Sequence, residues 1–344
     1  MRITSTRRKL FALATLAGAA LSFTAPTKAG MLDIIKQRGQ LVCGVHLGLP
    51  GFGYADDKGV WRGLDIDYCR AISAAIFNDP TKIIFKPTAP KDRFIVVQAG
   101  EVDILARNAT YTLSRDTSLG MNWPAINFFD GQGFIVRKSL NLKSAKELNG
   151  ASVCVAQGTT TEMNLADFAR SNGIKIETIA YATNEEGVKA FESGRCDSFT
   201  TDTSGLAAER LKFAKPDDFV VLPDVISKEP LGPAVRHGDE QWTDIVRWVH
   251  YAMLNAEEYG VTQANVDEML KSTNPEIRRL LGVEGKFGEG MGLTNDWAYR
   301  IIKHVGNYGE AFERNVGPAS PLKIQRGMNA LYTKGGLQYA YPIR

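Results

Sequence analysis

The sequence lacks the features by which several large classes of protein are recognised. None of its apolar runs reaches the ~18–20 residues that a membrane-spanning helix needs. It has four histidines and four cysteines, with no H-E-x-x-H or G-x-S-x-G motif and no glycine spacing typical of a dinucleotide site. No two cysteines form the C-x-x-C pair that is typical of a structural zinc site. We therefore expect neither an integral membrane protein nor an enzyme, and neither a metal nor a cofactor.

Extremes of composition and charge are also missing. Hydrophobic residues make up 44% of the chain and charged residues 23%, which are ordinary values for a globular protein. A chain of 344 residues is long enough for about two domains. Residues 1–29 hold five of the 41 basic residues and no acidic one, so the rest of the chain has 36 basic and 38 acidic residues and a net charge of −2. This balance argues against a nucleic-acid partner.

The N-terminal segment has the three parts of an export signal in the right order. Residues 7–9 are basic, residues 10–25 are apolar, and residues 27–29 offer small side chains to a signal peptidase. We predict a signal peptide over 1–29, cleaved near Ala29, and a soluble mature protein outside the cytoplasm. An amphipathic or buried N-terminal helix is the alternative. The two adjacent arginines do not decide between the Sec and Tat routes.

Export changes how the cysteines are interpreted. The chain has four of them: Cys43, Cys69, Cys154 and Cys196. In an oxidising compartment they favour two disulfides, for which three pairings are possible. Four buried free thiols would be the default in a cytosolic protein.

Strands and helices alternate along most of the chain. Short apolar runs predict strands, and apolar residues at helical spacing predict the helices between them. The first unit has predicted helices over 31–38, 65–77 and 93–99 and strands over 41–45, 83–85 and 102–105. A similar unit begins after Gly133, and the segment from Gln241 onward is mostly helical. The pattern predicts an α/β fold with largely parallel sheets.

The residues around Arg115 could form an anion site. The segment 108–116 follows a predicted strand, and Thr112 or Ser114 can cap the helix after it. The free N–H groups of a capped helix start and the planar guanidinium of Arg115 would together attract a carboxylate. The alternative is a surface ion pair between Arg115 and Asp116, which would contribute little.

Two further segments offer a second anion contact and a carboxylate. Residues 157–162 lead from a strand through a glycine turn to hydroxyl groups at a helix start, where an anion could bind. A plain N-cap by Thr160 or Thr161 is the alternative. Asp202 ends a predicted parallel strand, at the edge where α/β sheets bind ligands, and could accept hydrogen bonds from an ammonium group. An N-cap for the following helix is the alternative at Asp202.

Taken together, these segments resemble the periplasmic amino-acid-binding proteins of ABC transporters, which form solute-binding protein family 3. The resemblance covers about residues 31–255 and depends on the order and spacing of five motifs: Gly63-Leu64-Asp65-Ile66-Asp67, Gly100-Glu101-Val102-Asp103, the segment 108–115, Gln157-Gly158-Thr159-Thr160 and Gly194-Arg195-Cys196-Asp197. The C-terminal segment that ends Gly335-Gly336-Leu337-Gln338-Tyr339 is similar to the general L-amino-acid-binding branch.

The resemblance implies a type II periplasmic-binding-protein fold with two lobes, each a mainly parallel sheet flanked by helices, and a helical C-terminal extension. Lobe 1 would comprise residues 30–129 and 232–344, and lobe 2 residues 130–231, with hinge crossings near 128–133 and 229–233. Such a protein would be a periplasmic monomer that captures L-amino acids by hinge closure and delivers them to a membrane permease. A secreted dehydratase-like enzyme or a ligand sensor on the same scaffold are the alternatives.

The resemblance also assigns the candidate binding residues. The α-carboxylate would be held by Asn108, Thr110 and Arg115 of lobe 1 and by Thr159 or Thr160 of lobe 2. Asp202 would take the α-ammonium. Many relatives carry an aromatic residue over the ligand, and here Leu49 holds that register, with Phe52 and Tyr54 close by as candidates.

The implied lobes lead to two more predictions. Disulfides within each lobe would pair Cys43 with Cys69 and Cys154 with Cys196. No charge beyond those already assigned is evident in the matched segments to select a side chain, which predicts broad specificity for L-amino acids. An unmatched charge such as Lys91 or Arg93 at the side-chain end of the ligand would contradict this.

Overall fold

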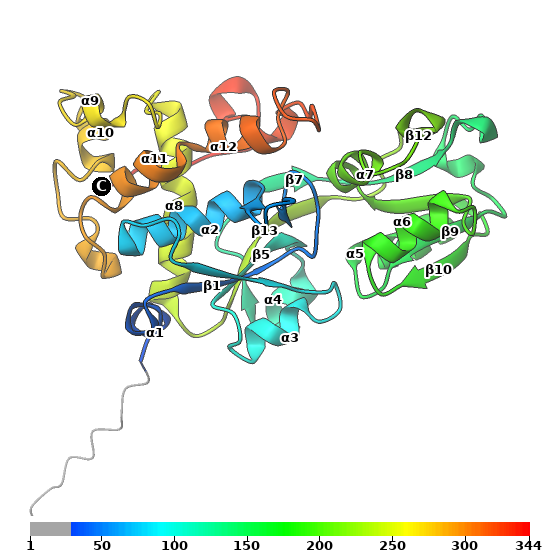
Figure 1. Ribbon diagram of the computed structural model, residues 1–344, viewed down its shortest axis with the longest axis horizontal. Helices are drawn as coiled ribbons and strands as arrows, with labels where there is room; N and C mark the ends of the chain where they lie inside the picture. The colour runs from blue at the N-terminus through cyan, green and yellow to red at the C-terminus, as the bar shows by residue number, and fades with distance from the viewer. Residues whose placement is uncertain (1–28) are drawn as a thin grey trace, which may run out of the picture.

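The computed structural model describes residues 29–344, so the predicted signal peptide lies, apart from Ala29, outside the described residues. Two lobes lie side by side, and each is built on a β-sheet with helices packed on it (Figure 1). The C-terminal helices gather at the far end of lobe 1, away from lobe 2 (Figure 1). The predicted two-lobe α/β fold with a helical C-terminal extension is confirmed.

Lobe 1 contains a six-stranded sheet in the order β4-β1-β5-β13-β6, with β7 also paired to β13. The strands are β1 (Leu41–Val45), β4 (Ile83–Pro87), β5 (Ile104–Thr110), β6 (Met121–Asn122), β7 (Phe128–Asp130) and β13 (Glu229–Arg236). The helices that precede the hinge are α1 (Met31–Arg38), α2 (Leu64–Phe77), α3 (Arg93–Gln98) and α4 (Leu113–Leu119). A small hairpin joins β2 (Tyr54–Ala55) to β3 (Trp61–Arg62).

Lobe 2 contains a five-stranded sheet in the order β10-β9-β11-β8-β12. Its strands are β8 (Gln132–Arg137), β9 (Ser152–Ala156), β10 (Glu177–Tyr181), β11 (Ser198–Asp202) and β12 (Phe219–Val221). Its helices are α5 (Thr160–Asn172), α6 (Asn184–Glu192) and α7 (Thr203–Arg210).

Both sheets are mixed, whereas the sequence predicted mainly parallel ones. Strands joined by helical crossovers run parallel: β1 with β4 and β5, and β9 with β10 and β11. The antiparallel strands are β13 in lobe 1 and β8 in lobe 2. Each of these enters its sheet directly from the other lobe, without the helical crossover that a parallel neighbour requires. The chain thus passes from β7 into β8 and returns from β12 into β13.

The two disulfides join the pairs that the sequence predicted. Cys43 on β1 is bonded to Cys69 on α2, with a Cα–Cα distance of 6.5 Å. Cys154 on β9 is bonded to Cys196 just before β11, with a Cα–Cα distance of 5.7 Å. The bridges close loops of 26 and 42 residues, so each should stabilise its lobe by ~3–4 kcal/mol on the chain-entropy estimate.

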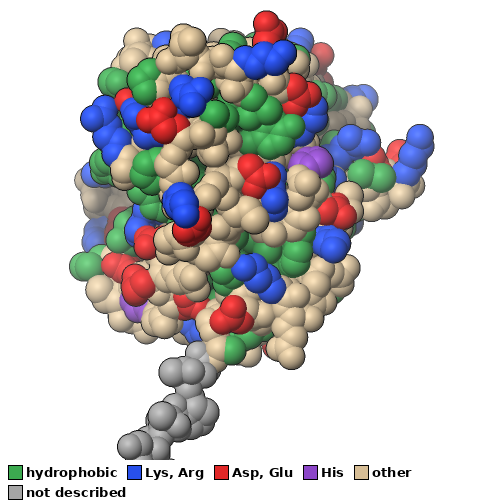
Figure 2. All heavy atoms as spheres, turned by 90° about the vertical axis from the view of Figure 1, so that its left-hand side faces the viewer, with side chains coloured by type: hydrophobic (Ala, Val, Ile, Leu, Met, Phe, Trp, Pro, Cys, Tyr) green, Lys and Arg blue, Asp and Glu red, His purple; other side chains and the backbone are tan. Residues whose placement is uncertain are grey.

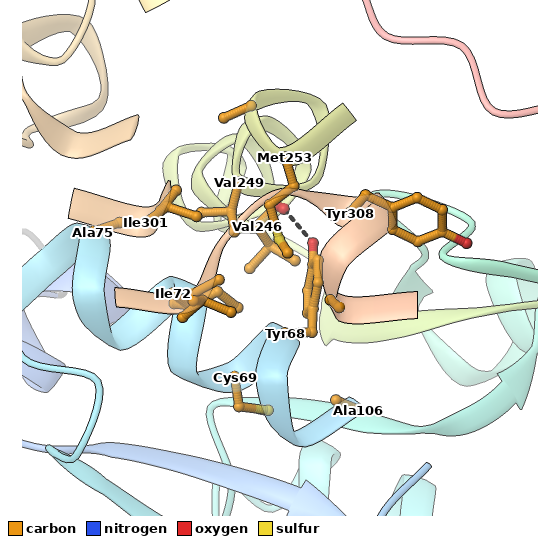
Figure 3. Close-up of a cluster of buried hydrophobic side chains, with 14 of the residues drawn as sticks. Tyr68, Cys69, Ile72, Ala75, Ala106, Val246, Val249, Met253, Ile301 and Tyr308 are labelled. Carbon is orange, nitrogen blue, oxygen red and sulfur yellow. Dashed lines mark hydrogen bonds between the residues drawn. The ribbon is translucent and has the colours of Figure 1, made fainter. Parts of the chain in front are cut away.

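The C-terminal helices enlarge the core of lobe 1. They are α8 (Glu240–Glu258), α9 (Val266–Met269), α10 (Pro275–Leu280), α11 (Trp297–Val305) and α12 (Tyr308–Asn315). Figure 3 shows apolar side chains of α2, such as Ile72, facing Val249 of α8 and Ile301 of α11. The hydroxyl of Tyr68 donates a hydrogen bond of 2.5 Å to the carbonyl of Val246 inside this core (Figure 3). Helix α2 therefore packs between the sheet and the C-terminal helices.

The end of the chain binds the segment that leads into the hinge. The side-chain amide of Asn329 accepts a hydrogen bond of 2.6 Å from the Phe129 N–H and donates one of 3.0 Å to the Phe129 carbonyl. Gln338 donates to the carbonyl of Ile126, 3.1 Å away. The extension thus holds residues 126–129 through their backbone, just before the chain enters lobe 2.

Charge on the outer end of lobe 1 is mixed. Figure 2 shows basic and acidic side chains interspersed over this face. Within residues 29–344, no helix combines the length and the apolar character needed to cross a bilayer. Over the same residues, no group of three His, Cys, Asp or Glu side chains is arranged to hold a metal ion.

The buried imidazole of His250 should make folding stability depend on pH. Its Nε2 lies 3.1 Å from Oε1 of Gln338, and burial lowers its pKa to about 4 from the ordinary 6.5. The unfolded chain takes up this proton near pH 6.5 and the folded chain only near pH 4. The stabilising contribution is therefore fully present above pH 6.5 and is lost as the pH falls toward 4, up to about 3 kcal/mol.

Denaturant unfolding of wild type and His250→Gln at pH 7 and at pH 4 measures this contribution. We expect wild type to lose up to about 3 kcal/mol more of its free energy of unfolding than the variant does. Using the difference cancels other titrating groups, such as buried Asp65, whose raised pKa acts in the opposite direction. Parallel pH profiles for the two proteins would show that His250 does not titrate as described.

Candidate functional site

A small cavity lies where the two lobes meet. Lobe 1 contributes His46, Pro90, Arg93, Arg107, Asn108 and Thr110. Lobe 2 contributes Thr159, Thr160, Thr161, Asn184, Thr201 and Asp202. Five of the eight predicted binding residues therefore line one cavity: Asn108, Thr110, Thr159, Thr160 and Asp202.

Arg115 lies directly behind this lining. Its Nη1 donates a hydrogen bond of 2.8 Å to the carbonyl of Thr110, and the residue is only 6% exposed. Thr112 caps α4 by accepting from the backbone N–H of Arg115 at 3.3 Å. The alternative of a surface ion pair with Asp116 is not what the structure shows, because the Asp116 carboxylate contacts His237 at 3.4 Å instead.

Asn108 is fixed by the acidic residue of the first motif. Its backbone lies in the left-handed region with φ of 33°, a conformation that asparagine tolerates better than most residues. The backbone N–H of Asn108 donates a hydrogen bond of 3.0 Å to the carboxylate of Asp65 at the start of α2. The side-chain amide of Asn108 then reaches across to lobe 2 and donates to Asp202 at 3.4 Å.

Thr110 and Thr160 face each other from opposite lobes, with their hydroxyl oxygens 3.3 Å apart. Both donate to the same carboxylate oxygen of Glu229, at 2.6 Å and 3.0 Å. Thr159 is the N-cap of α5, where the sequence had offered Thr160 or Thr161 as the plain cap. The hydroxyl of Thr160 therefore faces the meeting point of the lobes instead of capping the helix.

Asp202 is a buried carboxylate at the carboxyl end of β11. It occupies the N-cap position of α7 but makes no side-chain cap bond, because Asp130 accepts from the Ser204 N–H at 3.2 Å. Burial raises the pKa of Asp202 well above its ordinary value, and the nearby carboxylates of Asp130 and Glu229 raise it further. A cation beside Asp202 would relieve this cost.

Three buried guanidinium groups lie at the cavity, where the sequence indicated one: Arg93 and Arg107 in its lining and Arg115 behind it. Burial lowers the pKa of Arg107 and of Arg115 to about 10 each, and that of Arg93 well below its ordinary value. The guanidiniums of Arg93 and Arg115 lie 4.9 Å and 5.0 Å from the centre of the same ring, that of Phe94. An arginine over an aromatic face gains a favourable electrostatic contact, which helps this ring hold both side chains.

His46 is another lining residue that the sequence did not single out. Its Nδ1 accepts a hydrogen bond of 3.0 Å from the N–H of Gly48. Burial lowers the pKa of His46 well below its ordinary value, and the charge of Arg107 lowers it further. The ring is therefore neutral, with its proton on Nε2, where it can donate to a ligand.

The two candidate aromatic residues lie away from the cavity. Phe52 is buried in the core of lobe 1, with its ring 5.2 Å from that of Phe128. Tyr54 lies on β2 and lines a different pocket, near Arg314. Gly63, the glycine of the first motif, allows the chain to pass close to this loop. A Cβ atom at this position, where φ is 130°, would lie 2.0 Å from the carbonyl oxygen of Phe52.

Comparisons with known proteins agree with this geometry. The family model described as bacterial extracellular solute-binding proteins, family 3, matches residues 41–265. The chain is 52% identical, over 98% of its length and 100% of the relative's, to the general L-amino acid-binding periplasmic protein AapJ of Rhizobium johnstonii. It is also 52% identical, over 97% of each chain, to the glutamate/glutamine/aspartate/asparagine-binding protein BztA of Rhodobacter capsulatus.

Solved structures extend the likeness to the whole fold. A periplasmic binding protein of an ABC transporter from Brucella ovis, with glutathione bound, is 55% identical and superposes with a TM-score of 0.91, covering 92% of this chain and 100% of that one. An ancestral arginine-binding protein bound to arginine is 26% identical with a TM-score of 0.56, over 65% of this chain and 95% of that one.

Proposed function

Because the chain belongs to the bacterial extracellular solute-binding proteins of family 3, we propose that it is the extracytoplasmic component of an ABC transporter. In this role it captures L-amino acids between its lobes and delivers them to a membrane permease. The observation that carries the proposal is one cavity with the guanidinium of Arg115 behind one wall and the buried carboxylate of Asp202 in another. A zwitterion presents the two complementary charges.

The roles of the lining residues follow from their chemistry. Arg115 supplies the charge for the α-carboxylate, and Asn108, Thr110, Thr159 and Thr160 surround it with amide and hydroxyl groups. Asp202 accepts hydrogen bonds from the α-ammonium, which offsets the cost of burying its own charge. Phe52 and Tyr54 have no role in this proposal, because neither lines the cavity.

Closure of the lobes is part of the proposal. Lobe 1 would comprise residues 30–129 and 232–344 and lobe 2 residues 130–231, with hinge movement in the segments that join them. Contacts across the cleft support closure, among them the hydrogen bond of 2.9 Å from Nζ of Lys212 to the carbonyl of Gly48. Pairs such as Thr110 and Thr160 would separate when the lobes open and release the ligand.

The setting of the protein is inferred from its relatives. AapJ is a periplasmic protein by name, and the Brucella structure is that of a periplasmic binding protein. We therefore propose that residues 1–29 are a cleaved signal peptide and that the mature protein acts in the periplasm as a monomer. The relatives are named for binding L-amino acids in general or acidic amino acids and their amides, and one holds glutathione, so we propose L-amino acids as the ligand class.

Calorimetry on residues 30–344, unfolded and refolded with the disulfides intact to remove bound ligand, tests this function. We expect several L-amino acids to bind, and D-isomers and amines without a carboxylate to bind far more weakly. Absence of binding by all twenty L-amino acids would contradict the proposal, and release of a reaction product would favour the dehydratase-like enzyme. Unchanged amino-acid uptake in cells that lack the gene would favour the ligand sensor.

A further inference from the structure

Three guanidinium groups are buried around the cavity, and one α-carboxylate needs only one of them. Arg93 and Arg107 line the cavity, and Arg115 lies directly behind it. None of the three is more than 6% exposed. In a neutral amino acid the carboxylate matches Arg115 and the ammonium matches Asp202. The other two arginines need a different explanation.

Two of the three arginines have counter-charges within the protein. Among the acids, Asp65 does most to keep Arg107 charged by raising its pKa, and Glu229 does most to keep Arg115 charged. Each of these guanidiniums also donates to a backbone carbonyl, at 2.9 Å and 2.8 Å. Arg107 and Arg115 are therefore compensated before any ligand arrives.

Arg93 has no such compensation. Within residues 29–344 its buried Nε has no hydrogen-bond partner, and its guanidinium forms no ion pair. The acid that most supports its charge is Asp202, which lies in the opposite lobe. Asp202 is also the residue assigned to the ligand's ammonium. A ligand that pairs with Asp202 leaves Glu229 as the remaining acid that supports Arg93. Glu229 already accepts from Thr110 and Thr160 and supports Arg115, so the buried charge of Arg93 is then poorly compensated, which is costly.

The groups beside Arg93 are donors. His46 carries its proton on Nε2, because its Nδ1 accepts from the backbone, and Arg107 has only N–H groups. Burial is the largest cause of the lowered pKa of His46, and the positive charges of Arg107 and Arg93 lower it further. A ligand group that fits here must accept several hydrogen bonds and carry negative charge, and a carboxylate does both.

We propose that Arg93, together with Arg107 and His46, forms a second anion subsite that selects ligands with a second carboxylate. The ligand class comprises acidic L-amino acids and short γ-linked glutamyl peptides, whose far carboxylate is carried by the next residue. This inference rests on the proposed function, in which Arg115 and Asp202 take the α-carboxylate and α-ammonium. The subsite makes the specificity narrower than the sequence predicted. Of the two charges that could select a ligand side chain, Arg93 lines the cavity, whereas Lys91 is exposed.

Calorimetry of the wild-type protein with matched ligand pairs tests the subsite without any substitution. The pairs are glutamate with glutamate γ-methyl ester, and γ-glutamylglycine with its C-terminal amide. We expect the charged member of at least one pair to bind at least about 30-fold more tightly, the lower end for a buried charge pair. The pair with the larger difference identifies the source of the carboxylate. Equal affinity within both pairs would overturn the subsite.

Substitution then assigns the effect to Arg93. We expect Arg93→Met to lose most of the preference for glutamate over its ester, measured as the ratio of the two affinities within the one variant. The matched control is Lys91→Met, which removes one exposed positive charge close by and should keep the preference. A preference retained by Arg93→Met would overturn the assignment. Wild-type protein that binds amino acids but shows equal affinity within both ligand pairs would disprove the subsite and leave the proposed function intact, whereas no binding of any L-amino acid would disprove both.

Discussion

Replacing Arg115 by alanine is expected to weaken binding of every L-amino acid by roughly 30-fold to several thousand-fold, or about 2–5 kcal/mol. The change removes the charge that matches the α-carboxylate, a group that all these ligands share. Arg115→Lys should fail as well, because an ammonium cannot offer the planar pair of N–H donors that a guanidinium does. Calorimetry with glutamine and glutamate measures both variants.

The control for Arg115 must separate lost binding from lost folding. Arg195 is an exposed arginine in lobe 2, so Arg195→Ala removes the same charge from the surface and should bind ligands like wild type. Thermal unfolding without ligand shows whether Arg115→Ala retains its fold. A well-folded Arg115→Ala protein that binds within threefold of wild type would remove Arg115 from the site.

Local sequence patterns were sufficient for most elements of the fold. The predicted helix 31–38 and strand 41–45 coincide with α1 and β1, because the periodicity is clear and Gly39 ends the helix in a left-handed conformation, with φ of 76°. The cysteine pairing followed once each pair was placed in one lobe. The direction of β8 and β13 was not predictable in this way, since it depends on how the chain crosses between lobes.

The sequence indicated Arg115, Asp202 and most of the polar groups of the site, but it did not place the additional arginines at the cavity. Asn108 and Thr110 lie in the last part of β5 and Asp202 ends β11, and the carboxyl ends of these strands face the cavity, which sequence patterns can show. Arg93 and His46 lie at the start of a helix and in a loop, and only lobe packing brings them to the cavity. Glu229 could have been found from the sequence, because it directly precedes the apolar stretch Pro230–Val235. An acidic residue at that position is expected to be buried, as Glu229 is.

Phe52 and Tyr54 show the limit of reasoning from nearness in sequence. Both lie within a few residues of Leu49, and aromatic side chains often cover ligands. The loop closes on itself instead, with hydrogen bonds of 2.8 Å and 2.9 Å between Leu49 and Gly53. This turn directs Leu49 and Phe52 into the core of lobe 1, where burying apolar area is favourable. Distance along the chain did not show which way the loop would turn.

Asp202→Asn should have opposite effects on binding and on stability. The amide keeps the shape of the side chain but leaves the ligand's ammonium without its anion, so affinity should fall roughly 30-fold to several thousand-fold. Without ligand, ionised Asp202 is a buried charge near the carboxylates of Asp130 and Glu229, which is why its pKa is raised. A neutral amide removes this repulsion and also the attraction to Arg93, but the surroundings together raise the pKa of Asp202, so the repulsion and the burial cost are the larger effects. The variant should therefore unfold at the same temperature as wild type or a higher one.

This combination distinguishes a binding residue from a structural one, because loss of a structural contact would lower affinity and melting temperature together. The raised pKa adds a test with a definite sign: only ionised Asp202 can accept from the ammonium, so wild-type affinity should rise with pH through that pKa and then level off. Asp217→Asn is the matched control, since the side chain of Asp217 is 98% exposed. If Asp202→Asn binds glutamine within threefold of wild type, or if it melts well below wild type, then Asp202 does not serve as the ammonium site described here.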